Sequence, residues 1–328
     1  MTRINNKGKI AYILAGTLFA IVTLALLGNA KSDKFNLPYS QIPYCVVSPK
    51  PPTETLFAGE KIDLTRQDRR ERLDREILAF TYSHINTLLQ IKRANRLFPI
   101  VEPILKECGV PDDFKYLMII ESNGDIYARS TVGAAGLWQF MEKTAQQYGL
   151  EVNSYIDERY NIEKATRAAC DYLKESYEIY GDWLTVAASY NAGRNNISKR
   201  IEKQQEGKAI NLQLVPETSR YIFRLLAAKI IFDDPVAYGF IIQNRDLYPP
   251  LPIAKKITVS RPVKSWAAVA QKHGLTYLQL REANPWIRDP ELPAAKNAKK
   301  YTVLIPDSAG LHYNPEKTKA HNKKWVIK

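Results

Sequence analysis

Cysteine and histidine are scarce in this chain of 328 residues, which has three of the first and four of the second. Cys45, Cys108 and Cys170 are odd in number and lack close paired spacing, so they indicate neither a zinc site nor a disulfide framework. The histidines are scattered and no glycine-rich phosphate loop is present, so we expect no metal and no cofactor. Cys108 and Cys170 lie in apolar helical patterns typical of core residues, although a bridge between them is left open for an oxidising compartment.

Nucleic-acid-binding motifs with interleaved aromatic residues and glycines are also lacking. The net charge of +13 suits any polyanion or an anionic membrane surface, and charge alone does not choose among them. We therefore expect no nucleic-acid partner.

The first 30 residues have the order of an export signal. Arg3, Lys7 and Lys9 precede an uncharged run over residues 10–30. The sequence predicts a signal peptide or N-terminal membrane anchor over residues 1–30 and a location in the cell envelope or periplasm. The apolar residues 10–27 are near the lower limit of roughly 17 to 25 residues for a bilayer span, so cleavage and retention stay equally open.

Residues 31–72 contain five prolines and are predicted to form an extended spacer. A helical domain is predicted over residues 73–248. Its first apolar stripe is Leu78, Tyr82, Ile85 and Leu89. A second stripe ends at Gly109, and Pro103 within it is expected to kink the helix unless it lies in the first turn.

Glu121 follows an almost uninterrupted apolar helix that opens at Pro111. At the C-terminal end of such a helix, desolvation and the negative pole of the helix dipole both raise the pKa of a carboxyl group. A carboxylic acid that stays protonated near neutrality can act as a general acid. The alternative is a helix-end carboxylate that pairs with an arginine such as Arg129.

Several short motifs follow Glu121 and Ser122: GAAGLWQFM at 133–141, DER at 157–159, ATRAA at 165–169, GDW at 181–183 and SYNAG at 189–193. Over about residues 75–245 the chain resembles lytic transglycosylases of the family 1 soluble-lytic-transglycosylase type, closest to the membrane-bound lytic murein transglycosylase D group. The resemblance implies a mainly α, lysozyme-like catalytic domain of the α+β superfamily.

The resemblance also implies roles for particular residues. Glu121 is expected to be the single catalytic acid and base, with Ser122 orienting its carboxylate or the substrate. Tyr190 and Asn191 are expected near the reacting sugar, and Tyr221 near the glutamate. The expected cleft-lining residues are Gly136, Leu137, Trp138, Gln139 and Phe140, with Gln139 bonding an acetamido group and Trp138 offering an aromatic surface.

Each of these positions has a structural alternative. Trp138, Phe140 and Tyr190 are each compatible with core packing, and the glycines with simple turns. We expect Asp157, Arg159 and Arg167 to form a structural ion-pair network.

The reaction that the resemblance implies is cleavage of the β-1,4 bond between N-acetylmuramic acid and N-acetylglucosamine in peptidoglycan glycan strands. The product would carry a 1,6-anhydro-N-acetylmuramic acid end. Two alternatives stay open: a lysozyme-like hydrolase that uses the same glutamate with an attacking water, and a cell-wall-binding scaffold with a dead site.

A proline cluster at residues 248–252 marks a predicted domain boundary. Beyond it the order strand 257–259, helix 266–273, helix 276–283 and strand 301–305 resembles a βααβ LysM carbohydrate-binding module, predicted over residues 253–306. Residues 307–328 are rich in lysine and are predicted to be a solvated basic tail.

Overall fold

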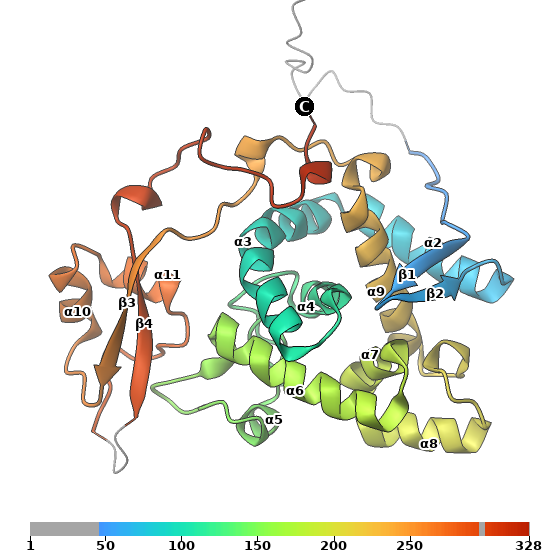
Figure 1. Cartoon of the computed structure of the whole chain (residues 1–328), viewed down its shortest axis with the longest axis horizontal. Helices are drawn as coiled ribbons and strands as arrows, with labels where there is room; N and C mark the ends of the chain where they lie inside the picture. Colours follow the sequence, from blue (N-terminus) through green and yellow to red (C-terminus); the bar gives the residue numbers. More distant parts are fainter. Residues whose placement is uncertain (1–45, 295–298, 328) are drawn as a thin grey trace, which may run out of the picture. The chain divides into compact units, whose positions relative to one another are not determined.

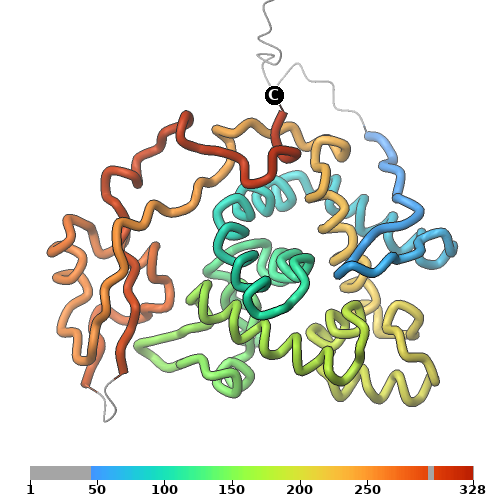
Figure 2. The backbone as a smooth tube through the Cα atoms, viewed as in Figure 1, coloured from blue at the N-terminus to red at the C-terminus, as the bar shows by residue number. Residues whose placement is uncertain are grey.

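The computed structural model describes residues 46–294 and 299–327, so the predicted export segment lies outside the described residues. Every element below lies in one compact unit, residues 48–328. Figures 1 and 2 show a mainly helical architecture, as expected. Its first elements are the hairpin β1 (Glu54–Phe57) and β2 (Glu60–Asp63), followed by α2 (Gln67–Tyr82), α3 (His84–Cys108), α4 (Lys115–Ser122), α5 (Glu142–Gln147), α6 (Ile162–Tyr180), α7 (Trp183–Ala192), α8 (Arg194–Gln204) and α9 (Pro216–Asp233).

Short 3-10 helices connect these elements. They are η2 (Asp112–Phe114), η3 (Glu158–Tyr160), η4 (Ala209–Asn211), η5 (Pro235–Tyr238), η6 (Asn244–Asp246), η7 (Ala309–Leu311) and η8 (Lys323–Trp325).

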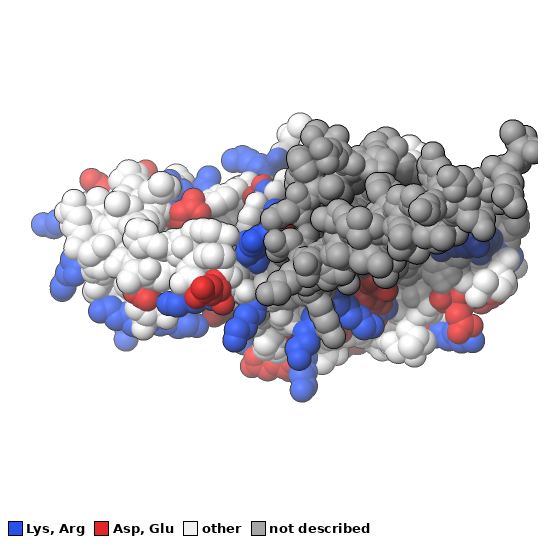
Figure 3. Space-filling view, turned by 90° about the horizontal axis from the view of Figure 1, so that it is seen from above, with Lys and Arg blue, Asp and Glu red and all other residues white. Residues whose placement is uncertain are grey.

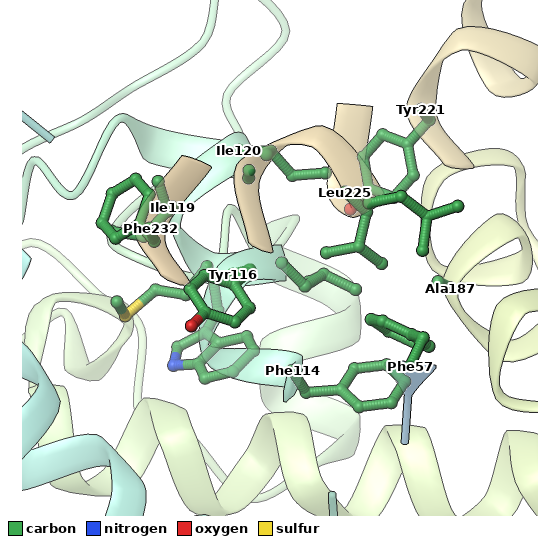
Figure 4. Close-up of a cluster of buried hydrophobic side chains, with 14 of the residues drawn as sticks. Phe57, Phe114, Tyr116, Ile119, Ile120, Ala187, Tyr221, Leu225 and Phe232 are labelled. Carbon is green, nitrogen blue, oxygen red and sulfur yellow. The ribbon is translucent and has the colours of Figure 1, made fainter. Parts of the chain in front are cut away.

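Helix α4 forms the centre of the helical domain, and it packs against α3 and α9 (Figure 1). All of its residues from Tyr116 to Ile120 are buried, as the apolar sequence predicts. Figure 4 shows this helix's side chains in a cluster with Phe57, Leu225 and Phe232. Asn123 ends the helix in the left-handed conformation, with a φ of 55°. This cap fixes the position of the C-terminal end of α4, which carries Glu121.

The predicted stripe from Leu78 to Leu89 does not form one helical face, because the chain breaks at Ser83 between α2 and α3. Helix α2 buries Leu73 and Ile77 instead, and Ile85 is 76% exposed. Helix α3 runs through its two internal prolines to Cys108, and Gly109 ends it as predicted.

The described part of the predicted spacer is folded rather than extended. Hairpin β1–β2 carries Phe57, which is 1% exposed and packs on Phe114 with ring centroids 5.7 Å apart. The backbone N–H of Ala58 donates to Asp113 Oδ2 at 2.7 Å. The predicted domain boundary at residue 73 lies inside α2, which begins at Gln67. The helical domain also includes the hairpin before α2, because Phe57 is buried in the core of that domain.

The C-terminal module has the βααβ order that the sequence predicts. Strands β3 (Ile253–Ser260) and β4 (Lys300–Pro306) pair antiparallel, with helices α10 (Trp266–Lys272) and α11 (Tyr277–Ala283) between them in the chain. Thr276 and Gln279 form a capping box at the start of α11. The module has its own core around Trp266, and Ile156 of the helical domain is buried in that core.

The C-terminal segment is not the solvated tail that its lysines predict. Trp325 is 1% exposed, its ring packs edge-on against Phe98 and Phe232, and its Nε1–H donates to the carbonyl oxygen of Phe232 at 2.7 Å. A single large aromatic side chain buries enough apolar surface to hold an otherwise polar segment. We call residues 319–327 the C-terminal clasp.

Asn95 on α3 joins this clasp to the point where the chain leaves the helical domain. Its side-chain amide donates to the carbonyl oxygens of Tyr248 at 3.1 Å and Lys319 at 3.2 Å, and its Oδ1 accepts from the backbone N–H of His321 at 2.7 Å. Figure 2 shows the outgoing and returning segments passing along the same side of the domain. The module is therefore held at both of its ends.

Three further features bear on the expectations from sequence. Cys108 and Cys170 are free thiols, and burial together with the neighbouring Cys108 raises the pKa of Cys170. On the visible part of the face in Figure 3, basic and acidic side chains lie interspersed. No helix in the described ranges is long and apolar enough to cross a bilayer.

Candidate active site

The carboxylate of Glu121 lies in the last turn of α4 and faces helix α9. The hydroxyl of Tyr221, which is buried on α9, donates to Glu121 Oε1 at 2.5 Å. Within residues 46–294 and 299–327, Glu121 has no ion-pair partner, so the structure does not contain the alternative of a carboxylate paired with Arg129. Tyr221 thus contacts Glu121, and the catalytic roles of the two residues stay a prediction.

Burial raises the pKa of Glu121 from its ordinary 4.5 to about 7. The hydrogen bond from Tyr221 and the charge of Arg224 lower it, and the charge of Glu217 raises it, but desolvation is the largest cause. Near neutrality the group therefore exists in both protonation states. Such a carboxyl group can donate a proton in one step and accept one in the next.

Gly136 is required by packing within the protein. Its φ is +75°, and a Cβ at this position would lie 1.9 Å from the carbonyl oxygen of Arg159. The same loop is fixed by Arg159, whose Nη1–H donates to the carbonyl oxygen of Gly133 at 2.9 Å. Gln139 donates from Nε2 to the carbonyl oxygens of Gly136 at 2.8 Å and Ala128 at 3.2 Å. These contacts hold the 133–140 loop in one shape.

The apolar residues of the loop are core residues. Trp138 is 0% exposed and its Nε1–H donates to Thr166 Oγ1 at 3.0 Å, so the predicted aromatic surface is wrong for this side chain. Leu137 and Phe140 are also buried. Their side chains pack in the core and support the 133–140 loop.

The end of α7 brings two more predicted residues to this region. Tyr190 is partly buried, and its hydroxyl donates to the carbonyl oxygen of Trp138 at 2.7 Å. Asn191 accepts a hydrogen bond at Oδ1 from the hydroxyl of Thr218 on α9, at 2.9 Å. That bond orients the amide group of Asn191 and makes its NH₂ the side available for other acceptors.

Ser122 is buried, and its hydroxyl donates to the carbonyl oxygen of Met118 at 3.0 Å, one turn back along α4. Of the predicted ion-pair network, Asp157 and Arg159 form a buried pair at 2.8 Å, while Arg167 pairs with Glu107 at the surface.

Sequence reasoning missed Thr218 and Arg224. Both lie on α9 three residues from Tyr221, one on each side, so helical spacing places them on the face that carries the tyrosine. That spacing was the available signal. In the ranges described, no cluster of three or more His, Cys, Asp or Glu side chains could hold a metal ion.

Two family models match the chain. Residues 100–213 match the transglycosylase SLT domain, and residues 255–309 match the soluble lytic transglycosylase C-terminal LysM-like domain. The first match contains Glu121 and the 133–141 motif, and the second covers most of β3 and all of α10, α11 and β4.

The chain is also similar to curated proteins. The chain is 28% identical over 247 residues to membrane-bound lytic murein transglycosylase D of Escherichia coli (strain K12), which covers 73% of this chain and 53% of the relative. It is 27% identical over 106 residues to a putative tributyltin chloride resistance protein of Alteromonas sp. (strain M-1), covering 32% and 51% of the two chains. The chain thus spans about half the length of the curated relatives that it matches.

Among solved structures, the chain is similar to an inactive mutant of the lytic transglycosylase Slt from Pseudomonas aeruginosa. That similarity has 19% sequence identity and a TM-score of 0.34, and it covers 43% of this chain and 24% of the other.

Proposed function

Because the chain carries a transglycosylase SLT domain followed by a LysM-like domain, we propose that it is a peptidoglycan lytic transglycosylase. Its substrate is the β-1,4 bond between N-acetylmuramic acid and N-acetylglucosamine, and its product is a 1,6-anhydro-N-acetylmuramic acid end. The observation that carries the proposal is the burial of Glu121, which brings its pKa to about 7.

In the first step the protonated carboxyl group of Glu121 gives its proton to the glycosidic oxygen. The bond between that oxygen and C1 of the muramic acid breaks, and the substrate's own acetamido group stabilises the positive charge at C1. A pKa of about 7 leaves a large fraction of the enzyme protonated at neutral pH, which this step needs.

In the second step the ionised Glu121 removes the proton from the C6 hydroxyl of the same sugar. The C6 oxygen then bonds to C1 and closes the anhydro ring, so water is not consumed and Glu121 regains its proton. One carboxyl group serves both steps, whereas most glycosidases use two. The Tyr221 hydroxyl supports this exchange, because it holds Oε1 in place and stabilises the ionised form.

Substrate orientation is assigned to polar groups around the glutamate. The Asn191 amide, turned by Thr218, can donate to a sugar acetamido oxygen, and the Gln139 amide oxygen can accept from a sugar N–H or hydroxyl group. Tyr190 and the backbone of the 133–140 loop complete the proposed subsite. Leu137, Trp138 and Phe140 shape this loop from the core side.

We assign the protein to the cell envelope, where its substrate is found. The E. coli relative is named as membrane-bound, and residues 10–27 are the segment of this chain that would serve as an anchor or signal. Fractionation of cells that express the full chain, with and without residues 1–30, tests this assignment.

Product mass tests the reaction. Purified peptidoglycan is digested with the parent protein and with Glu121→Gln, and the released fragments are weighed by mass spectrometry. We expect fragments one water lighter than hydrolysis products from the parent and no release by Glu121→Gln. Fragments of hydrolytic mass would identify a lysozyme-like hydrolase, and equal release by the two proteins would remove Glu121 from the mechanism.

A further inference from the structure

The segment between α5 and α6 joins the helical domain to the LysM-like module. Ile156 in this segment is 0% exposed and lies in the core of the module. The backbone N–H of Asp157 donates to the carbonyl oxygen of Trp286 at 2.9 Å. In the other direction, the backbone N–H of Arg288 donates to the carbonyl oxygen of Tyr155 at 2.9 Å. The helical domain therefore contributes a side chain to the module's core and shares backbone hydrogen bonds with the module.

A second contact with the module is a cluster of charges around Glu151, at the start of the same segment. Arg261 Nη2 and Lys299 Nζ of the module lie 2.5 Å and 2.7 Å from the two carboxylate oxygens of Glu151. The hydroxyl of Tyr301 donates to Glu151 Oε2 at 3.0 Å. The side chains of Glu151 and Arg261 are 13% and 11% exposed, so salt screens this pair little and loss of one partner leaves a poorly solvated charge. The module is therefore docked by charge as well as by apolar burial.

The segment that contacts the module also fixes the 133–140 loop. Asp157 is 7% exposed, and its two carboxylate oxygens accept from Arg159 Nε at 2.9 Å and Nη2 at 2.8 Å. This bidentate pair orients the guanidinium group. The remaining nitrogen, Nη1, donates to the carbonyl oxygens of Gly133 at 2.9 Å and Phe140 at 3.2 Å. Asp157 thus binds the module through its backbone and the arginine that holds the loop through its side chain.

We propose that the LysM-like module is a positioning element for cleavage: docked on residues 151–157, it holds the 133–140 loop in its substrate-binding shape, with Asp157 and Arg159 as the positioning residues. The inference rests on the proposed function, in which this loop forms part of the subsite beside Glu121. The role requires no contact between the module and the substrate. Coupling of this kind is reciprocal, so an ordered loop also stabilises the docked module.

Hydrogen exchange of the full-length protein measures the order of the loop without any substrate. The backbone N–H groups of Ala135 and Gly136 donate to the carbonyl oxygens of Phe140 at 3.1 Å and Ala128 at 2.9 Å, so their exchange rates report the shape of the loop. Asp157→Asn keeps the backbone bond to the module and removes the charge that orients the guanidinium group. We expect exchange in the loop to be about tenfold faster, the effect typical of one lost hydrogen bond between charged groups. Exchange in the buried helix α3 should stay as in the parent.

Variants at the docking surface test the route from the module. Glu151→Gln removes the charge shared by Arg261 and Lys299, and Ile156→Asp places a charge in the module's core. Each should speed exchange in the loop by about three- to tenfold, less than Asp157→Asn, because the pair that orients the guanidinium group is kept. Glu151→Gln decides the question if Ile156→Asp does not fold.

The matched control breaks a different contact between the module and the helical domain. Lys256 of β3 pairs with Glu163 of α6 at 3.0 Å, and both side chains are more than half exposed. Such a pair contributes little to docking, so Lys256→Met should leave exchange in the loop within about twofold of the parent.

Reciprocity supplies a measurement that a purely local role would not move. Arg159→Lys keeps the charge but loses the fork that reaches both loop carbonyl oxygens. We expect it to speed exchange of the Arg288 amide, which belongs to the module, by about threefold or more. Exchange of this amide at the parent's rate would contradict the coupling.

The pH profile of kcat/KM on purified glycan strands connects the loop to cleavage. Asp157→Asn and Glu151→Gln should lower the maximal kcat/KM and leave the pH of the alkaline limb unchanged, because the pKa of Glu121 depends on its burial and on residues of α9. Unchanged loop exchange in Glu151→Gln and Ile156→Asp, with α3 protected as in the parent, would overturn the positioning role and leave the proposed function standing. Failure of the parent to cleave the strands would overturn the proposed function instead, while the exchange rates would still show whether the module orders the loop.

Discussion

The hydrogen bond from Tyr221 to Glu121 sets the pH range in which the carboxyl group keeps its proton. A hydroxyl that donates to a carboxylate stabilises the ionised form, so the bond lowers the pKa of Glu121. Tyr221→Phe removes the donor and keeps the ring that fills the core. The pKa of Glu121 should then rise further above its present value of about 7.

The size of the rise follows from the strength of the bond. A hydrogen bond to a charged group contributes about 1.5 kcal/mol or more, and one pKa unit corresponds to about 1.4 kcal/mol, so the increase is about one unit. At pH 7.5 the protonated fraction of Glu121 would rise from roughly one quarter to roughly three quarters. The alkaline limb of kcat/KM, where the acid loses its proton, should therefore move from about pH 7 to about pH 8.

The assay is the pH profile of kcat/KM on purified glycan strands. The pH at which kcat/KM falls does not depend on the maximal value of kcat/KM. A lower rate caused by poorer orientation of Glu121 therefore does not hide the shift. Tyr190→Phe is the matched control, because its hydroxyl donates to the carbonyl oxygen of Trp138 and not to Glu121. If the alkaline limb of kcat/KM lies at the same pH in Tyr221→Phe, Tyr190→Phe and the parent, the hydrogen bond from Tyr221 does not set the pKa of Glu121.

Three further predictions concern stability. Because the pKa of Glu121 is raised in the folded state, the unfolding free energy of the parent should fall by about 3 kcal/mol between about pH 4.5 and pH 7. Chemical unfolding at pH 4 and pH 8 measures this fall, and Glu121→Gln should not show it. Gly136→Ala should cost more than about 3 kcal/mol because of the clash with Arg159, whereas Gly133→Ala, which meets no atom within 4 Å, should cost about 1 kcal/mol of backbone strain; similar melting temperatures for the two would contradict the packing argument. Trp325→Ala should destabilise the helical domain by about 3 to 5 kcal/mol in denaturant unfolding, and a change below 1 kcal/mol would show that the clasp contributes little.

The raised pKa of Glu121 was easier to predict from the sequence than the surface of the 133–140 loop. It depends on a local feature, an apolar helix that ends on a carboxylate, whereas the catalytic role came from the resemblance and stays a prediction. Trp138 was misassigned as a sugar-facing surface, since whether an aromatic side chain points inward depends on the loop as a whole. That loop is shaped by Gly136 and Arg159, which are 23 residues apart in the sequence, as their numbers show.

The fold was predictable where patterns are local and regular. The βααβ order of the module follows from short strands, capping residues and turns. The hairpin at Phe57 and the clasp at Trp325 could not be found in this way. Each depends on one aromatic side chain in a polar segment that meets a distant core, and a single residue leaves no periodicity to detect.

Asn95 gives the molecule the topology of a domain insertion. The chain leaves the helical domain at Tyr248 and returns to it at Lys319, and the carbonyl oxygens of both residues accept from the Asn95 side chain. The residues between them, 249–318, are therefore inserted into the helical domain. A stop codon after residue 248 would delete these residues and would also remove Trp325 from the core of the helical domain. An internal deletion that splices residue 248 to residue 319 through a short linker would remove the inserted residues alone. The two shortened proteins should therefore behave differently, and only the spliced one reports what the LysM-like module contributes to the proposed activity.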